Sequence, residues 1–106
     1  MSMRPEELKG HLDGLILAVV ATEPLHGYAV IEQLKARSGG ALALPEGTIY
    51  PALHRLEADG LLESAWSTAS GRRRRVYSIT RRGEKELGAS RKRWRVFAGT
   101  IEAVLA

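Results

Sequence analysis

The sequence predicts a mainly α-helical fold with one small β-hairpin. Apolar residues recur at helical spacing through most of the 106-residue chain, whereas the pattern between Leu62 and Ile79 changes to a period of two. Turns that contain glycine or proline separate the segments, so the expected order is three helices, a hairpin and a long last helix. A chain of this length forms one domain that hides only about two-thirds of its unfolded surface, and a second copy would add burial.

Composition narrows the range of functions. The chain has no cysteine, and His11, His26 and His54 fall on separate segments. We therefore expect no disulfide, no metal site, no cofactor and no enzyme active site. The apolar run from Gly14 to Ala21 is too short to span a bilayer, and no signal peptide is evident, so a cytoplasmic protein is expected.

Positive charge is gathered in one part of the chain. Between Arg72 and Arg95 there are eleven Lys or Arg residues and two acids, whereas the remainder is acidic overall and the net charge is +4. This asymmetry predicts a protein that binds a polyanion such as nucleic acid. A solvated charged face is the alternative that charge alone leaves open.

The first two helices are expected from Glu6 to Thr22 and from about Gly27 to Arg37. Gly10 and Gly14 weaken the first helix locally, but small residues on a helix also mark close packing against another helix. The apolar segment Ala41–Leu44, which follows the second helix, is expected to be a connector or a brief strand.

A third helix is expected from about Glu46 to Asp59, and Gly60 ends it. Its buried face is apolar and consists of Ile49, Ala52, Leu53 and Leu56. Its exposed face carries Thr48, Tyr50, His54 and Arg55. Hydroxyl, imidazole and guanidinium groups suit phosphates and base edges, so this helix is predicted to be a DNA recognition helix. An ordinary amphipathic surface helix is the alternative.

A two-stranded hairpin is expected over residues 62–79, with Arg72, Arg73, Arg74 and Arg75 at or beside its tip. Alternation places Arg73 and Arg75 on one face and Arg72 and Arg74 on the other. Adjacent guanidinium groups repel one another unless a polyanion lies nearby, so we expect them to grip DNA phosphates. A solubilising loop is the alternative. Trp66, on the first strand, is expected to cover the helices.

The last helix is expected from Arg81 to about Val104, with Thr80 as its N-cap. Apolar residues on one face predict a dimerisation seam, which consists of Leu87, Trp94, Phe97, Ile101, Val104 and Leu105. Trp94 and Phe97 could instead form a platform for an aromatic ligand. The chain is thus expected to divide into a DNA-binding part, residues 1–80, and a dimerisation helix, residues 81–106.

A helix-turn-helix followed by a hairpin is the winged-helix arrangement, in which the basic hairpin is the wing. Three motifs in this order resemble the PadR family of bacterial transcriptional regulators, in its short form with a single C-terminal helix. They are HGYAVIEQL (residues 26–34), LPEGTIYPALHRLEADGLLES (residues 44–64) and GRRRRVYSITRRGEKEL (residues 71–87). Pro45 departs from the pattern, because many relatives have a capping serine there.

The resemblance implies a homodimer, joined mainly by the last helix, that binds an imperfect inverted repeat in double-stranded DNA and represses transcription. It also implies release from DNA by a small effector, which in some relatives is a flat aromatic compound that stacks on a tryptophan of the last helix. The resemblance implies that Trp94 occupies the corresponding position here. No membrane partner is implied.

The residues expected to contact DNA are Tyr28, Lys35, Thr48, Tyr50, His54, Arg55, Arg72, Arg73, Arg74 and Arg75. Several have an alternative role: Tyr28 and Tyr50 could pack between helices, Arg55 could pair with an acid such as Asp59, and Lys35 could be merely solvated. For the whole protein, the alternative is a winged-helix protein-interaction module whose basic wing has no DNA sequence preference.

Overall fold

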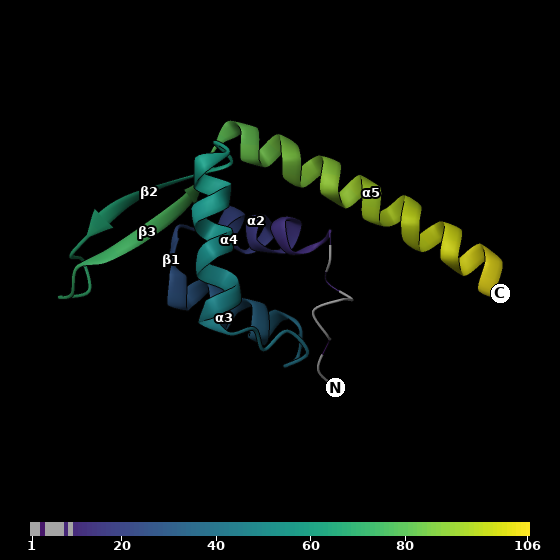
Figure 1. Ribbon diagram of the computed structural model, residues 1–106, viewed down its shortest axis with the longest axis horizontal. Helices are drawn as coiled ribbons and strands as arrows, with labels where there is room; N and C mark the ends of the chain where they lie inside the picture. The colour runs from purple at the N-terminus through teal and green to yellow at the C-terminus, as the bar shows by residue number, and fades with distance from the viewer. Residues whose placement is uncertain (1–2, 4–7, 9) are drawn as a thin grey trace.

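The computed structural model describes residues 3, 8 and 10–106. Its elements in chain order are α2 (Leu12–Thr22), β1 (Leu25–His26), α3 (Gly27–Arg37), α4 (Glu46–Ala58), β2 (Leu62–Ser67), β3 (Arg74–Ile79) and α5 (Arg81–Leu105). The fold is mainly helical with a small antiparallel sheet in the order β1-β3-β2, which confirms the predicted fold class. Helices α2, α3 and α4 form a cluster, from which the β2–β3 hairpin leaves on one side and α5 on the other (Figure 1).

The core lies where the three clustered helices meet the sheet. Its most deeply buried side chains are those of Ile16, Leu17, Val20, Val30, Ile49, Leu53, Leu56 and Leu62. Ile49, Leu53 and Leu56 are among them, which confirms the apolar face predicted for the third helix. Burial of each large apolar side chain stabilises the fold by about 1.5–3 kcal/mol. Gly60, with φ of 78°, adopts the left-handed conformation after the C-cap Asp59 and ends α4 as predicted.

Helix α2 is shorter than the helix predicted from Glu6 to Thr22. Gly10 has φ of 84°, and residues 10 and 11 form a turn, so the regular helix begins only at Leu12. Residues 6, 7 and 9 of the predicted helix lie outside the described residues. Gly14 does mark close packing: a Cβ there would overlap the Ser90 side chain of α5. Glycine therefore lets α2 and α5 approach each other closely.

Strand β1 was not predicted. Leu25 and His26, expected in a turn, pair with Tyr77 and Val76 of β3. Two residues are too few for an alternating pattern, so periodicity has nothing to detect. The brief strand considered at Ala41–Leu44 is not formed, because that segment is a turn followed by irregular backbone.

The β2–β3 hairpin forms where it was predicted. Leu62 pairs with Ile79 and Trp66 with Arg75, and β3 begins at Arg74. The expectation for Trp66 was wrong. Its side chain is 54% exposed, because it lies on the face of the hairpin that carries arginines rather than on the helices.

Helix α5 begins as predicted, since Thr80 Oγ1 accepts a hydrogen bond from the amide of Gly83 at 3.0 Å. Its first half packs on α2, and its second half extends away from the cluster (Figure 1). The radius of gyration, 14.7 Å, accordingly exceeds the roughly 13 Å of a compact chain of this length. No helix in the described part of the chain is long and apolar enough to cross a membrane.

Leu87 requires a correction to the predicted dimerisation seam. It is only 5% exposed and belongs to the core of its own chain. Leu87, Trp94 and Ile101 share one face of α5, but Leu87 is buried in the core whereas Trp94 and Ile101 are exposed. Leu87 therefore has almost no surface to offer a second copy.

Candidate nucleic-acid interface

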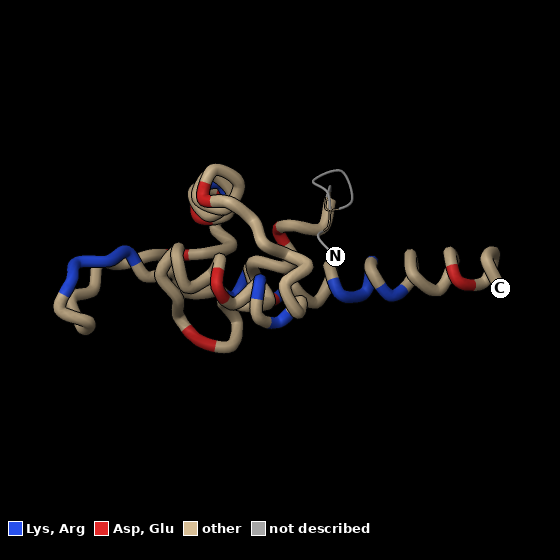
Figure 2. The backbone as a smooth tube through the Cα atoms, turned by 90° about the horizontal axis from the view of Figure 1, so that it is seen from below, with Lys and Arg blue, Asp and Glu red and all other residues tan. Residues whose placement is uncertain are grey.

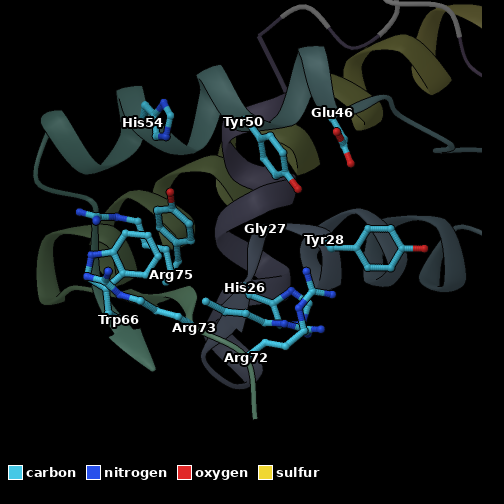
Figure 3. Close-up of a pocket in the computed structure, with 12 residues that line it drawn as sticks. His26, Gly27, Tyr28, Glu46, Tyr50, His54, Trp66, Arg72, Arg73 and Arg75 are labelled. Atoms are coloured by element: carbon cyan, nitrogen blue, oxygen red, sulfur yellow. The ribbon is translucent and has the colours of Figure 1, made fainter. Parts of the chain in front are cut away.

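A groove of about 660 Å³ runs between α4, the start of α3 and the hairpin, and is called the wing groove below (Figure 3). Helix α4 contributes Glu46, Tyr50 and His54 to its lining. The start of α3 contributes His26, Gly27 and Tyr28. The hairpin contributes Trp66, Tyr77 and all four arginines from Arg72 to Arg75. Among the described residues, no group of three His, Cys, Asp or Glu lies together as a metal site requires.

The residues predicted on the exposed face of the third helix divide between two flanks of α4. Tyr50 and His54 face the wing groove (Figure 3). Thr48 and Arg55 lie on the opposite flank, because successive residues advance by about 100° around a helix. The structure therefore brings Tyr50 and His54 together with the hairpin arginines, and leaves Thr48 and Arg55 outside the groove.

Tyr50 is held at the groove by close packing on Gly27. A Cβ on Gly27 would overlap the Tyr50 ring, so a glycine is required where α3 passes α4. The ring is partly buried in this contact, yet it also lines the groove. Tyr50 therefore has the packing role that the sequence left open, and its ring also faces the wing groove. His54, about one turn further along α4, is exposed.

The hairpin arginines reach the wing groove from two faces of the strand. The guanidinium carbons of Arg73 and Arg75 lie 4.2 and 5.4 Å from the centroid of the Trp66 ring. Arg74 Nη1 instead lies 2.6 Å from His26 Nε2, at the start of α3. The predicted alternation therefore holds for these three residues, and it spreads positive charge over two walls of the groove.

Arg75 also joins the hairpin to α4. Its Nε donates a hydrogen bond to Ser64 Oγ at 2.7 Å, and Ser64 Oγ donates to Glu57 Oε2 at 2.7 Å. Arg75 Nη2 lies 3.7 Å from the same Glu57 oxygen. These contacts hold the hairpin at a set position beside α4, so Arg75 supports the groove as well as lining it.

His26 links α3 to the hairpin. Its Nδ1 accepts a hydrogen bond from the amide of Ala29 at 3.2 Å and so caps α3. Its Nε2 faces Arg74. A neutral imidazole has one acceptor nitrogen, so the amide and the guanidinium compete for it, and a protonated ring accepts from neither. Burial, followed by the charge of Arg74, lowers the pKa of His26 below its ordinary value of 6.5.

We expect the protein to lose stability as the pH falls below about 6.5. In that range an unfolded chain protonates His26, whereas the folded protein resists protonation because the folded-state pKa is lower. The stability is fully present above the unfolded pKa and is lost towards the folded value. Urea unfolding at about pH 8 and about pH 5.5 measures the effect.

The matched control is His26→Asn, whose side-chain oxygen can still cap α3 but does not titrate. Its urea midpoint should depend less on pH than that of the original protein. An equal pH dependence in both proteins would contradict a role for His26 protonation.

Arg55 is bound to α2. Its two Nη atoms each donate a hydrogen bond of 2.7 Å to the carboxylate of Asp13. These hydrogen bonds are the main cause that raises the pKa of Arg55, while Asp59, the partner considered from the sequence, adds only a charge effect. The two side chains are 51% and 42% exposed, so solvent screens the pair and its net stabilisation is modest. The pair sets the direction of Arg55 beside α4.

Of the two candidate residues on α3, one lies at the wing groove. Tyr28 lines the groove and is 55% exposed, so packing between helices does not describe it. The nearby Glu32 carboxylate, one turn along α3, raises the pKa of Tyr28. Lys35 is exposed in the last turn of α3 and does not line the groove.

The basic segment from Arg72 to Arg95 is divided between two separate parts of the structure. Figure 2 shows Lys and Arg positions at the end of the hairpin and, apart from them, along α5. At the wing groove, the arginines from 72 to 75 lie beside the N-termini of α3 and α4, whose helix dipoles also favour anions. The Glu46 carboxylate is the one acidic group among the described residues of the lining. This combination suits the phosphates of a nucleic-acid backbone.

The second half of α5 carries an exposed apolar surface, called the α5 seam below. It consists of Trp94, Phe97, Ile101, Val104 and Leu105, which are 42 to 81% exposed. The Trp94 and Phe97 rings lie 5.9 Å apart, and His11 of the turn before α2 lies 5.5 and 6.1 Å from them. His11 gave no sequence signal, because nothing in its neighbourhood indicates contact with α5. Large apolar side chains that are exposed together on one helix are typical of an interaction surface.

The helix cluster, with α4 exposed beside a basic hairpin, defines a winged helix-turn-helix protein. The model of the transcriptional regulator PadR-like family matches residues 16–89. The chain belongs to this family of transcriptional regulators, as its three motifs indicated.

Known relatives agree with this assignment. The chain is 43% identical over 77 residues to the transcriptional regulator Rv3488 of Mycobacterium tuberculosis (strain ATCC 25618 / H37Rv), a match that covers 73% of this chain and 69% of that protein. A PadR family transcription regulator of Clostridium difficile R20291 superposes with a TM-score of 0.81 and 31% identity, over 92% of this chain and 100% of that chain. A PadR-like regulator of Bacillus cereus strain ATCC 14579 gives 0.83 and 30%, over 94% and 96%.

Proposed function

We propose that the protein is a dimeric, sequence-specific DNA-binding repressor. In this proposal α4 enters the major groove of double-stranded DNA, and the backbone of one strand lies in the wing groove. One observation carries it: the arginines from 72 to 75 face Tyr50 and His54 of α4 across the wing groove (Figure 3). Such a regulator acts on the chromosome and therefore in the cytoplasm.

The two flanks of α4 are proposed to serve the two strands that border the major groove. Tyr50 and His54 contact the strand nearest the wing, and Tyr28 contacts its phosphates from α3. Thr48 and Arg55, on the far flank, contact the bases and the opposite strand, and Lys35 contributes a phosphate contact. The DNA-binding part is residues 1–80, and the dimerisation helix is residues 81–106.

Arg55→Ala is expected to weaken binding to the operator by roughly 1–3 kcal/mol and binding to scrambled DNA far less, because alanine cannot reach the base. Asp13→Asn, which removes the charge that holds Arg55, is expected to strengthen binding to both duplexes slightly, since Arg55 is released and a nearby negative charge disappears. Fluorescence anisotropy with labelled duplexes measures both effects. Equal losses on operator and scrambled DNA for Arg55→Ala would remove its base-reading role.

The α5 seam is proposed to join two copies of the chain. Two such helices side by side would cover the exposed apolar side chains and place two copies of α4 on one DNA molecule. Adjacent major grooves lie about 34 Å apart, which sets the spacing that an inverted repeat requires.

Ile101→Glu is expected to convert the dimer into monomers, because a carboxylate in an apolar seam is strongly unfavourable. Ala103→Glu, on the opposite face of α5, is the matched control and should leave the dimer intact. Size-exclusion chromatography with light scattering measures the mass. Retention of the dimer by Ile101→Glu would exclude the seam as the interface.

Trp94 and Phe97, with His11 beside them, are also proposed as a platform for a flat aromatic effector that releases the DNA. Dimer packing alone is the simpler role for these rings. Titration with aromatic compounds should quench tryptophan emission if the platform exists. Trp94→Phe should abolish that response, whereas Trp66→Phe should preserve it.

The DNA-binding function is tested first with the DNA directly upstream of the gene for this protein, against a scrambled duplex, over a salt series. Tight binding that prefers the upstream DNA and weakens steeply with salt is expected, because released counterions drive much of the affinity. Equal and weak binding to the upstream duplex, the scrambled duplex and further promoter fragments would instead favour a protein-interaction module.

A further inference from the structure

Trp66 is the exposed aromatic residue of the hairpin. It lies on β2, directly opposite Arg75 of β3, and its side chain is 54% exposed. It lines the wing groove, with Tyr50 and His54 of α4 on the other side (Figure 3). A ligand that covers a large apolar ring removes it from water, and this stabilises the complex.

The ring is flanked by cations. The guanidinium carbon of Arg73 lies over the ring, 4.2 Å from its centroid, and that of Arg75 lies 5.4 Å from the centroid. A guanidinium stacked on an indole keeps its in-plane N–H groups free to donate hydrogen bonds. Trp66 therefore provides an apolar surface with the Arg73 guanidinium close beside it, while Arg75 is held nearby by Ser64 and Glu57.

The chemistry of this wall matches one strand of DNA better than an acidic peptide. A sugar–phosphate backbone repeats an apolar deoxyribose next to a phosphate, which corresponds to an indole next to guanidinium groups. An acidic peptide requires the arginines but has no regular apolar unit for the ring. The helix N-termini of α3 and α4 at the same groove further favour phosphate.

We propose that Trp66 is a DNA-binding residue: its indole packs on the deoxyribose of the backbone strand in the wing groove and positions Arg73 for the adjacent phosphate. This inference rests on the proposed DNA-binding function. The resemblance to PadR proteins did not assign Trp66, and the sequence pattern indicated the opposite orientation.

Tryptophan emission with acrylamide quenching tests the contact, with a dye-labelled duplex to report binding by anisotropy. At DNA concentrations that saturate the anisotropy, the emission of the original protein should become protected from acrylamide. In Trp66→Phe, where Trp94 is the remaining tryptophan, DNA at saturation should change the quenching little. Saturating anisotropy without protection in the original protein overturns the inference and leaves the DNA-binding function standing.

Two further outcomes would also overturn the inference. If no duplex raises the anisotropy, the DNA-binding function fails and the inference fails with it. If polyglutamate at the same ionic strength protects Trp66 as well as DNA does, the wall is a general surface for acidic chains, and the deoxyribose contact is overturned.

Affinity provides an independent readout. Trp66→Ala should weaken binding to DNA of any sequence by roughly 3- to 30-fold, as expected when a cation–π and packing interaction is removed. The slope of affinity against salt should stay nearly unchanged, because no charge is removed. Thr68→Ala, exposed on the same hairpin and outside the groove lining, is the matched control. Unchanged affinity in Trp66→Ala, with circular dichroism showing a folded protein, overturns the inference.

Discussion

Replacement of Arg72, Arg73, Arg74 and Arg75 by alanine is expected to weaken binding to any duplex by about 100-fold or more at about 0.1 M salt, because each phosphate that is no longer neutralised keeps its counterions. The arginines line one groove, so their effects should fall on operator and scrambled DNA alike. The salt slope should decrease by about one for each phosphate that the variant no longer binds. Anisotropy over a salt series measures both quantities.

The control must separate wing contacts from net charge. A variant with Lys85, Arg91, Lys92 and Arg95 replaced by alanine loses the same charge from α5, which contributes no residue to the lining of the wing groove. It should retain most of the affinity. Comparable losses in the two variants would mean that overall charge, and not the wing groove, attracts the DNA. A variant that keeps Arg75, which is tied to Ser64, checks that the loss does not come from a displaced hairpin.

Gly83→Ala is expected to destabilise the fold by about 1–3 kcal/mol or more. Gly83 is buried, and a Cβ there would overlap the carbonyl oxygen of Leu61 and lie 2.7 Å from Ile79 Cγ1. The carbonyl belongs to the backbone and cannot move aside without disturbing the start of β2. Urea or thermal unfolding measures the loss.

Gly88→Ala is the matched control on the same helix. Gly88 is exposed, and a Cβ there meets nothing within 4 Å. Alanine should stabilise α5 by about 0.5–1 kcal/mol through its better helix propensity. Equal effects of the two substitutions would show that the contact between Gly83 and Leu61 does not limit the packing of α5.

Hydrophobic periodicity was sufficient to predict the long helices and the hairpin. It failed where the structure depends on contacts between residues that are distant in sequence. The buried face of α4 was predictable because Ile49, Leu53 and Leu56 repeat within one helix. The partner of Arg55 was not, because Asp13 lies on another helix, 42 positions away. Alternation placed Trp66 on a strand face, but did not reveal which face the helices cover.

The same distinction holds at the candidate site. The run of arginines identified the wing as basic, and their spacing identified the two faces. Only the fold shows that His26 lies beside Arg74, or that Gly27 admits the Tyr50 ring. These relations arise from packing between α3, α4 and the hairpin, and local sequence does not contain that information.

The short pairing of β1 with β3 has a consequence for how this surface can be altered. Leu25 and His26, directly before α3, are hydrogen-bonded through the main chain to the same strand that carries Arg74 and Arg75. Main-chain pairing does not depend on the side chains of the turn, so the tip between Ser67 and Arg74 can be replaced while the paired strands and the contacts of Arg74 and Arg75 are kept. The protein is therefore suited to wing exchange, in which tips with a different charge or length are grafted onto one scaffold to retune its DNA affinity.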